Sequence, residues 1–358
     1  MSRAVQVEIP RSTREVARAS YQAISLYSPN RAPCRLDLSD NTNMWGVPPT
    51  VRSLLGSTAD PVITRYPRAY ADDLKRAIAA YLKVDPTCVV TGCGSDDVLD
   101  SAIRAFSEPG QTLAYPDPSF AMVEIFARMN GLTPVAIPLT GDYDVDADAF
   151  IASGAPVIYL CSPNNPTGTT LSRRSIERII ENAPGVVILD EAYAEFADGD
   201  CLDLLPASEP LVITRTMSKA FGLAGLRVGY AVGAPDIVCE IEKSRGPYKV
   251  SSLAERAAIT ALTEDRQWVE DRIAEARDSR AGLARELEKR GLAPIASEAN
   301  FVLARVQRAD RLAARLRENG VAVRPFPGLA GIGDAIRITV GPWAMMEECL
   351  AALDGVLA

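Results

Sequence analysis

The chain has 358 residues, of which 47% are hydrophobic and 23% are charged, as in a globular protein of more than one domain. Its formal net charge of -8 argues against nucleic acid or an anionic membrane as a partner. The chain contains no histidine, which excludes histidine acid–base catalysis and the Ser-His and Cys-His nucleophile pairs. Its cysteines and carboxylates show no zinc spacing, so no metal site is expected.

Seven cysteines, an odd number without a C-x-x-C spacing, indicate reduced thiols that are buried as small hydrophobic residues. The first residues lack the apolar segment of a signal peptide, and no apolar run reaches membrane-spanning length. We therefore expect a cytoplasmic protein whose ligands are small molecules.

Between residues 86 and 235, short β-branched runs alternate with helical patterns. This alternation predicts a mainly parallel sheet with helices on both faces and functional residues at the carboxyl ends of its strands. Helices are expected at 96–106, 120–129 and 173–182. The expected strands are 88–91, 112–115, 133–137, 157–161, 186–190, 211–214 and 228–232.

After Pro247 the pattern changes to one long predicted helix over 253–290, followed by a small α+β unit. In this unit we expect strands at 299–306, 321–324 and 335–340, a helix at 308–318 and a last helix from Trp343. The sequence thus predicts an α/β protein with three parts. They are an N-terminal arm at 1–50 that packs on the small domain or a partner subunit, a large domain at 51–247 and a small domain at 248–358.

Lys219 lies five residues beyond a predicted strand, close in sequence to Thr216, Ser218 and Arg227. Neighbouring cations and partial burial lower the pKa of a lysine, as Schiff-base chemistry requires. The two hydroxyl groups can donate hydrogen bonds, and the guanidinium fork of Arg227 matches a phosphate group. A polar surface loop could also contain these residues, but the apolar strand before them favours a buried site.

Asp190 ends a predicted strand, where a buried carboxylate is costly unless a cation faces it. A protonated pyridine nitrogen is such a cation, and the pair makes the ring an electron sink. Tyr193 and Asn165 are placed to contact a phenolic oxygen on the same ring. A helix N-cap remains an alternative role for Asp190, although it leaves Tyr193 and Asn165 unexplained.

The segment from Gly92 to Asp96, which includes Ser95, follows a strand and begins a helix, so its backbone amides can hold a phosphate. A dinucleotide fingerprint would need glycine at Asp97, which disfavours that reading. Phe120 is a candidate to stack on an aromatic ring, although such a residue is more often part of a core. The acid, the lysine and the phosphate-binding groups together indicate pyridoxal 5'-phosphate.

An ordered series of motifs runs along nearly the whole chain and resembles fold-type I pyridoxal-phosphate aminotransferases, most closely the histidinol-phosphate aminotransferase branch. The motifs are Asn41-Thr-Asn43, Arg65-Tyr-Pro67, Gly94-Ser-Asp96, Asn165-Pro-Thr-Gly168, Asp190-Glu-Ala-Tyr193, Ser218-Lys219, Arg227, Ala299-Asn-Phe301, Val323-Arg-Pro325 and Arg337-Ile-Thr-Val-Gly341.

This resemblance implies an enzyme that transfers an amino group between an amino substrate and 2-oxoglutarate, with Lys219 as the Schiff-base lysine. It places Asp190 at the pyridine nitrogen, Asn165 and Tyr193 at the phenolic oxygen, and Phe120 against the ring. The residues implied around the cofactor phosphate are Ser95, Asp96, Thr216, Ser218 and Arg227.

The resemblance also implies a homodimer, because Tyr66 would reach the cofactor phosphate of the partner subunit. Arg337 would bind the acidic end of the substrate, and Arg324 matches a second arginine of relatives that act on phosphate esters. Two arginines suit a phosphate dianion, which favours L-histidinol phosphate as the amino donor.

The family pattern Asn-Glu-Asn-Pro-Tyr-Gly is altered here, with Thr42 in place of glutamate and Trp45 in place of a tyrosine that contacts the substrate. Asn43 and Trp45 are still expected at the substrate.

Aromatic or specialised-metabolite transamination therefore stays open, since that branch also carries both arginines. A decarboxylase of the same fold stays open as well. A regulator would need a basic DNA-binding segment, which the sequence lacks.

Overall fold

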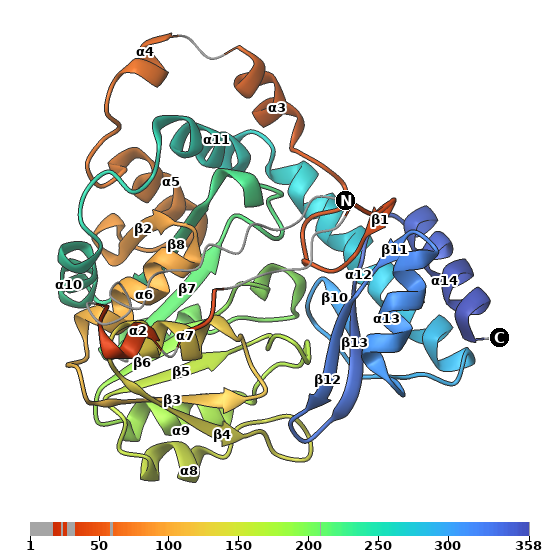
Figure 1. Cartoon of the computed structure of the whole chain (residues 1–358). Coiled ribbons are helices and arrows are strands. Elements are labelled where there is room, and N and C mark those ends of the chain that lie inside the picture. The colour runs from red at the N-terminus through yellow and green to blue at the C-terminus, as the bar shows by residue number, and fades with distance from the viewer. Residues whose placement is uncertain (1–16, 23, 27–32, 58–59, 208, 358) are drawn as a thin grey trace.

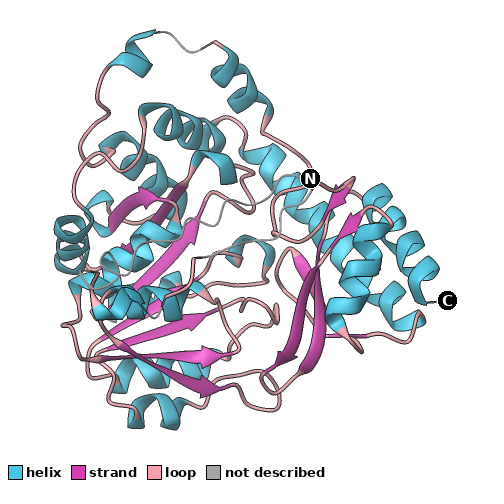
Figure 2. Cartoon of the chain, viewed as in Figure 1, coloured by secondary structure: helices cyan, strands magenta, loops and turns pink. Residues whose placement is uncertain are grey.

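The structure, a computed structural model, describes residues 17–22, 24–26, 33–57, 60–207 and 209–357 (Figure 1). Within these ranges a large unit holds a seven-stranded sheet, and a small unit near the C-terminus holds a four-stranded sheet (Figure 2). Residues 1–16 of the predicted N-terminal arm lie outside the described ranges. In the described part of the chain, no helix is both long and apolar enough to cross a membrane.

The large sheet contains the strands β2 (Val89–Cys93), β3 (Thr112–Asp117), β4 (Thr133–Pro138), β5 (Val157–Cys161), β6 (Val186–Asp190), β7 (Leu211–Thr216) and β8 (Val228–Gly233). They lie in the order β2-β8-β7-β6-β5-β3-β4. All neighbouring pairs are parallel except those of β8, which is antiparallel to both β2 and β7. The predicted α/β fold with a mainly parallel sheet is therefore confirmed.

Helices cover both faces of this sheet, because successive side chains of a strand point to opposite sides. In β5, Ile158 and Leu160 pack on one helix layer, whereas Val157 and Tyr159 pack on the other. One layer contains α6 (Ser95–Ala105), α7 (Met122–Met129) and α10 (Pro235–Arg245). The other contains α5 (Asp72–Leu82), α8 (Ala147–Ala152), α9 (Arg173–Asn182) and α11 (Ser252–Thr263).

The small unit holds β9 (Ala293–Pro294), β10 (Phe301–Arg305), β12 (Arg324–Leu329) and β13 (Gly333–Thr339) in an antiparallel sheet of order β12-β13-β10-β9. Its helices are α12 (Arg266–Lys289), α13 (Ala309–Glu318) and α14 (Trp343–Leu357), which lie beside this sheet in Figure 1. A parallel pair of β1 (Leu36–Asp37) and β11 (Val321–Ala322) joins the N-terminal segment to this unit. The remaining α-helices of the described residues are α2 (Ala19–Gln22), α3 (Pro49–Gly56) and α4 (Asp60–Thr64).

The single long helix predicted over 253–290 is wrong, since the structure has two helices, α11 and α12, that meet at Glu264 and Asp265. The carboxylate of the buried Asp265 accepts hydrogen bonds from the backbone N–H groups of Thr50 (3.1 Å) and Val51 (3.0 Å). Asp265 thus satisfies the unpaired amides at the start of α3. The α11 helix packs against α3 and α5, and the domain boundary after residue 247 stays a prediction.

The predicted strand 321–324 is also wrong, because the structure divides it between two sheets. Val321 and Ala322 pair with β1, whereas Arg324 begins β12, which contains Pro325 and Pro327. Proline lacks a backbone N–H group, so a strand with two prolines is tolerated at a sheet edge, where β12 lies.

The seven cysteines are all unpaired in the structure, in agreement with the expected reduced thiols. Burial was predicted for all of them, and this is wrong for Cys93 and Cys239, which are exposed. Cys161 and Cys349 are the buried members of the set.

Candidate active site

A cavity of about 670 Å³ opens at the carboxyl ends of β5, β6 and β7, between the large and small units. Its volume is typical of a pocket for a small molecule. The cavity brings together twelve residues that the sequence predicted at the site: Ser95, Asp96, Phe120, Asn165, Asp190, Tyr193, Thr216, Ser218, Lys219, Arg227, Arg324 and Arg337.

Lys219 lies in the loop that reverses the chain between β7 and the antiparallel β8. Its Nζ atom donates a hydrogen bond to the backbone oxygen of Asp40 at 3.4 Å and lies 5.5 Å from the ring centre of Tyr193. Burial lowers the pKa of Lys219 to about 8, and the nearby Arg337 guanidinium acts in the same direction. An appreciable fraction of this amine is therefore neutral near neutral pH, as a nucleophilic lysine requires.

Asp190 ends β6 and is only 3% exposed. Its Oδ1 atom accepts a hydrogen bond from the backbone N–H of Ala192 at 3.1 Å, and its Oδ2 atom accepts one from the Tyr159 hydroxyl at 2.8 Å. Burial raises the pKa of Asp190 to about 6, while these hydrogen bonds oppose the rise. The carboxylate is thus held in one orientation and remains mostly ionised at pH 7.

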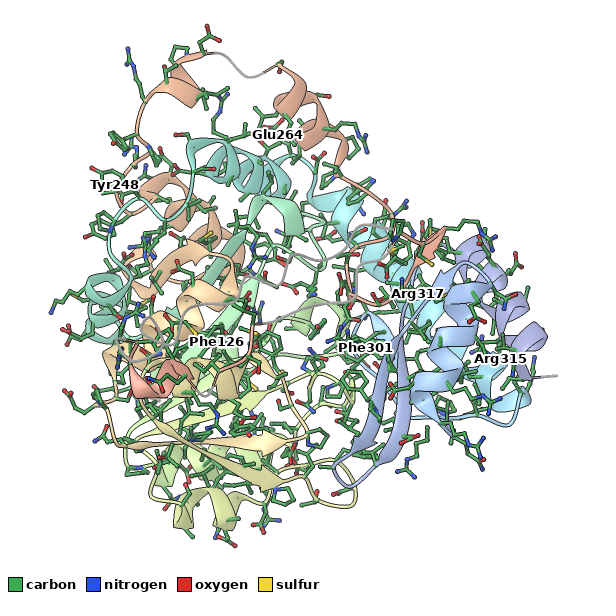
Figure 3. The ribbon with its side chains drawn as sticks, viewed as in Figure 1. Phe126, Tyr248, Glu264, Phe301, Arg315 and Arg317 are labelled. Atoms are coloured by element: carbon green, nitrogen blue, oxygen red, sulfur yellow. The ribbon has the colours of Figure 1, made fainter. Side chains whose placement is uncertain are left out.

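Tyr193 projects its phenol into the same cavity from the segment after β6. Its hydroxyl oxygen accepts a hydrogen bond from Asn41 Nδ2 at 3.1 Å, and its ring packs edge-on against Phe301 with 5.2 Å between centroids. Phe301 is labelled in Figure 3 on the side of the small unit that faces the large sheet. Burial raises the pKa of Tyr193 to about 12, so its phenol remains a hydrogen-bond donor at neutral pH.

An anion cradle is formed where α6 begins, beside the loop that contains Lys219. Thr216 Oγ1 donates to Ser218 Oγ at 3.0 Å, and Arg227 Nη2 lies 3.1 Å from Asp96 Oδ2. The α6 helix has eleven residues, and Ser95 and Asp96 of its first turn line the cavity. Hydroxyls, a guanidinium and a helix N-terminus together suit a phosphate group.

Two glycines allow the backbone to close tightly around this cradle. Gly94 has a φ of +82°, and a Cβ atom there would lie 2.4 Å from Arg227 Nη2. A Cβ atom on Gly229, in β8, would lie 2.1 Å from the backbone nitrogen of Ser95. Larger residues at these positions would displace the groups that surround the anion.

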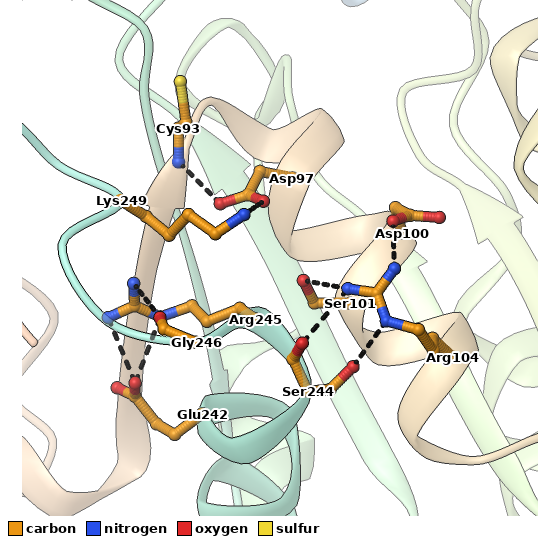
Figure 4. A network of polar contacts seen from close by, with 10 residues as sticks. All are labelled: Cys93, Asp97, Asp100, Ser101, Arg104, Glu242, Ser244, Arg245, Gly246 and Lys249. Carbon is orange, nitrogen blue, oxygen red and sulfur yellow. Dashed lines mark hydrogen bonds and ion pairs between the residues drawn. The ribbon is translucent and has the colours of Figure 1, made fainter.

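Helix α6 is anchored to α10 and to the loop that follows it (Figure 4). Lys249 Nζ donates to Asp97 Oδ1 at 3.1 Å, and the same carboxylate accepts from the backbone N–H of Cys93 at 2.9 Å. Arg104, in the last turn of α6, donates from Nε to Ser244 Oγ at 3.1 Å. These contacts fix the helix whose first turn lines the cavity.

Two arginines of the small unit line the opposite side of the cavity. Arg324 and Arg337 stand directly opposite each other on the antiparallel strands β12 and β13, so their side chains share one face of the sheet. Arg337 is buried, donates to the backbone oxygen of Ser39 at 2.7 Å, and lies over the rings of Phe301 and Phe326.

Three predicted site residues do not line this cavity. Asn43 instead donates from Nδ2 to the backbone oxygen of Ala220 at 3.0 Å. Trp45 donates from Nε1 to Glu275 Oε2, on α12, at 2.6 Å. The structure therefore gives no support to Asn43 and Trp45 as substrate contacts within their own chain. Tyr66 is 87% exposed at the surface, where its ring meets another tyrosine.

Two further site residues were not predicted from the sequence, namely Tyr159, which donates to Asp190, and Asn41, which donates to Tyr193. Tyr159 carries no local signal, because a tyrosine within an apolar strand normally indicates core. Asn41 belongs to one of the motifs quoted from the sequence, but no role followed from it. Its φ of +54° is unusual for a residue other than glycine, and a backbone angle is visible only in a structure. Asp40 and Thr42 of the same segment also line the cavity.

The donor set fits pyridoxal phosphate. A buried acid faces the cavity, an amine with a lowered pKa lies beside a phenol, and an anion cradle occupies one end. The ring nitrogen, aldehyde and phosphate of the cofactor require these three environments in this combination. The fold and these side chains define a pyridoxal-phosphate-dependent enzyme of fold type I.

The family described as aminotransferase class I and II matches residues 35–353, and the chain belongs to this family. It is 34% identical to a histidinol-phosphate aminotransferase of Caldanaerobacter subterraneus, over 93% of this chain and 96% of the relative. It is 37% identical to histidinol-phosphate aminotransferase 2 of Rhizobium meliloti, over 94% and 97% of the two chains.

A solved structure supports the same assignment. The crystal structure of histidinol-phosphate aminotransferase from Sinorhizobium meliloti in complex with pyridoxal-5'-phosphate superposes with a TM-score of 0.84 and 26% identity. The match covers 93% of this chain and 95% of that one. The protein is accordingly a pyridoxal-phosphate-dependent aminotransferase that acts on small-molecule amino and keto substrates.

Proposed function

We propose that this aminotransferase takes the amino group of L-histidinol phosphate and delivers it to 2-oxoglutarate. The observation that carries the proposal is the pair Arg324 and Arg337, which lie opposite each other in the cavity that also contains Lys219. Guanidinium groups bind phosphate through paired hydrogen bonds, and two of them match its double charge. The names of the relatives described above support the same substrate.

The cofactor would be held by the residues that line the cavity. Asp190 would face the ring nitrogen, Asn165 and Tyr193 would donate to the phenolic oxygen, and Phe120 would pack against the ring. The anion cradle of Ser95, Asp96, Thr216, Ser218 and Arg227 would hold its phosphate. When bound, pyridoxal phosphate supplies a conjugated ring that takes up the electron pair left at the substrate Cα.

Lys219 is the base in this proposal. Its Nζ atom accepts the proton of the substrate Cα, which is possible because its lowered pKa of about 8 leaves part of the amine neutral. Asp190, with a pKa of about 6, is an anion at neutral pH and keeps a proton on the ring nitrogen. Arg324 and Arg337 orient the substrate by its anionic end, so that its amine faces Lys219.

A homodimer with a cytoplasmic location completes the proposal. Tyr66 is 87% exposed and packs on the ring of Tyr248, with 5.4 Å between centroids. Both tyrosines are exposed large hydrophobic residues, as is the nearby Ile63. Such a surface is typical of a protein interface, where Tyr66 would extend into the cavity of the partner subunit.

The substrate assignment is tested by a panel of amino donors, namely histidinol phosphate, phenylalanine and tyrosine, each supplied with 2-oxoglutarate. Glutamate production is measured, and carbon dioxide is measured in parallel. We expect glutamate from histidinol phosphate, with the highest kcat/KM of the panel and no carbon dioxide. Release of carbon dioxide without glutamate would identify a decarboxylase of the same fold.

A second candidate is an aromatic aminotransferase, because the aromatic rings of Phe120 and Phe326 line the cavity. The same panel separates the two functions. If phenylalanine reacts well and histidinol phosphate is inert, the argument from the paired arginines is wrong and the aromatic function stands.

A further inference from the structure

We propose that Tyr159 is a positioning residue for Asp190, whose phenol fixes the carboxylate that faces the ring nitrogen of the cofactor and favours its charged form. This inference rests on the role proposed above for Asp190. The chain contains no histidine, so the side chain that donates to this carboxylate is of another kind. A phenol from the neighbouring strand takes that position here.

The geometry of the sheet brings the two side chains together. The β5 and β6 strands are parallel, and their register places Cys161 beside Asp190 and Tyr159 beside Ile188. Residues two apart on a strand share a face, so Tyr159 lies one step behind Asp190 on the same side of the sheet. Its hydroxyl donates to Asp190 Oδ2 at 2.8 Å.

Tyr159 has no exposed surface, and Asp190 is 3% exposed, so water does not compete for this hydrogen bond. The second oxygen of the carboxylate is held by the Ala192 N–H group at 3.1 Å. Two donors from different segments therefore fix the plane of the carboxylate. Hydrogen bonds to a charged acceptor are among the stronger ones in proteins, and their loss is not compensated inside a sheet.

The same contact affects the charge of Asp190. Burial raises the pKa of its carboxyl group to about 6, and the Tyr159 hydrogen bond acts against this rise because it stabilises the ionised form. The pKa of Tyr159 itself is raised well above its usual value by burial, so the phenol stays a donor at any working pH. Without it, Asp190 would be protonated at a higher pH.

Four other ionisable groups lie near Asp190. Asp96 on α6 raises the pKa of Asp190, and Cys161 on β5 and Tyr193 after β6 are neutral neighbours at pH 7. Lys219 lines the same cavity. None of these donates a hydrogen bond to the carboxylate in the described part of the chain, whereas Tyr159 does.

A matched control distinguishes the proposed positioning role of Tyr159 from a purely structural role. Tyr230, on β8 of the same sheet, is also fully buried, but its phenol lies near Arg215 and Glu195 instead of Asp190. Each of the substitutions Tyr159→Phe and Tyr230→Phe thus removes one buried phenolic hydroxyl from the large sheet. Only the first removes a hydrogen bond from the proposed site.

The experiment compares both variants with the wild-type holoenzyme. For each we measure the dissociation constant of pyridoxal phosphate, its bound absorption spectrum against pH, and kcat and KM against pH. For Tyr159→Phe we expect roughly ten-fold weaker cofactor binding. The acid limb of kcat should move up by about one pH unit, with the donor KM nearly unchanged. Tyr230→Phe should match the wild type in all three measurements.

Two further variants keep the outcome decisive. Tyr159→fluorotyrosine preserves the shape of the side chain with a more acidic phenol, and should move the acid limb to lower pH even if Tyr159→Phe folds poorly. Asp190→Asn tests the underlying role. If Asp190→Asn leaves spectrum and pH profile unchanged, the proposed role of Asp190 is wrong. If Asp190→Asn alters the spectrum and the pH profile while both Tyr159 variants match the wild type, the role of Asp190 stands and the proposed role of Tyr159 is wrong.

Discussion

Arg337 Nη1 donates a hydrogen bond to Asn165 Oδ1 over 2.5 Å, which joins β13 of the small unit to the turn after β5 in the large unit. The residue proposed to bind the substrate anion therefore contacts a residue proposed to bind the cofactor. Because the side-chain oxygen of Asn165 accepts this hydrogen bond, its amide nitrogen remains as the donor that the proposed cofactor contact requires.

The first prediction concerns this link. Arg337→Lys keeps the charge but loses the guanidinium fork, so we expect the KM of the amino donor to rise about ten-fold or more. The absorption spectrum of the bound cofactor should also shift, because Asn165 loses its partner. Steady-state kinetics and a pH titration of the spectrum measure both effects. Arg324→Lys is the control, since no hydrogen bond joins Arg324 to Asn165 among the described residues, and it should raise KM without altering the spectrum.

The second prediction concerns Lys219. Lys219→Ala should abolish the visible absorption of the cofactor in the purified protein and reduce kcat by roughly 10³-fold, because both the covalent attachment and the base are lost. Lys243→Ala is the control, since this lysine lies on α10 at the surface and pairs with Glu240. A variant at position 219 that keeps a wild-type spectrum would exclude this lysine as the attachment site.

The third prediction is a pH dependence of cofactor capture by the protein freed of cofactor. Lys219 must be neutral to react, and its pKa of about 8 means that the neutral fraction grows as pH rises toward 8. Asp190 must be ionised, and its pKa of about 6 means that this form is lost below pH 6. The capture rate followed by absorbance should fall steeply below pH 6, rise between pH 6 and 8, and level off above it.

The fourth prediction concerns stability. Burial raises the pKa of Glu195 to about 7, and neither oxygen of its carboxylate has a hydrogen-bond partner in the described part of the chain. The folded state therefore binds a proton on Glu195 more tightly than the unfolded state, in which the pKa of this carboxyl group is near 4.5. The resulting stabilisation is present below pH 4.5 and is lost as pH rises through 7.

Glu195→Gln should remove this loss of stability at high pH, because glutamine does not ionise. At pH 8 the variant should unfold at higher denaturant concentration than the wild type, by on the order of 2 kcal/mol in the free energy of unfolding, and the difference should vanish near pH 4.5. Equilibrium urea unfolding at the two pH values measures it. Equal stability at pH 8 would show that Glu195 is solvated or paired in solution.

The fifth prediction tests whether Tyr66 acts across the dimer. Lys219→Ala and Tyr66→Ala chains are each purified, then mixed under conditions that exchange subunits. If Tyr66 serves the partner cavity, each mixed dimer has one intact site, and random mixing restores about a quarter of the wild-type activity. If Tyr66 serves its own chain, no site is intact and no activity returns. Tyr248→Phe in place of Tyr66→Ala controls for a general weakening of the interface.

The sequence predicted the strands of the large sheet within a few residues, because each is an apolar β-branched run between helical segments. The site followed from this, since Asp190, Asn165 and Lys219 stand just after such runs. The break between α11 and α12 was not predictable, because the Asp265 carboxylate accepts a hydrogen bond from Thr50, which lies 215 positions away in the sequence. Tyr159 was missed for the same reason: its partner lies on another strand, and nothing in β5 itself distinguishes it from core.

Arg324 and Arg337 stand on the small sheet, whereas Lys219 lies in a loop that joins two strands of the large sheet, and the chain connects the two sheets through the turn at Asp265. An amino substrate with an anionic end would therefore contact both the large and the small unit, whereas an amine without an anionic end would contact only the large unit. On the substrate role proposed above for the two arginines, selectivity would depend on contacts that one ligand makes with both units at the same time.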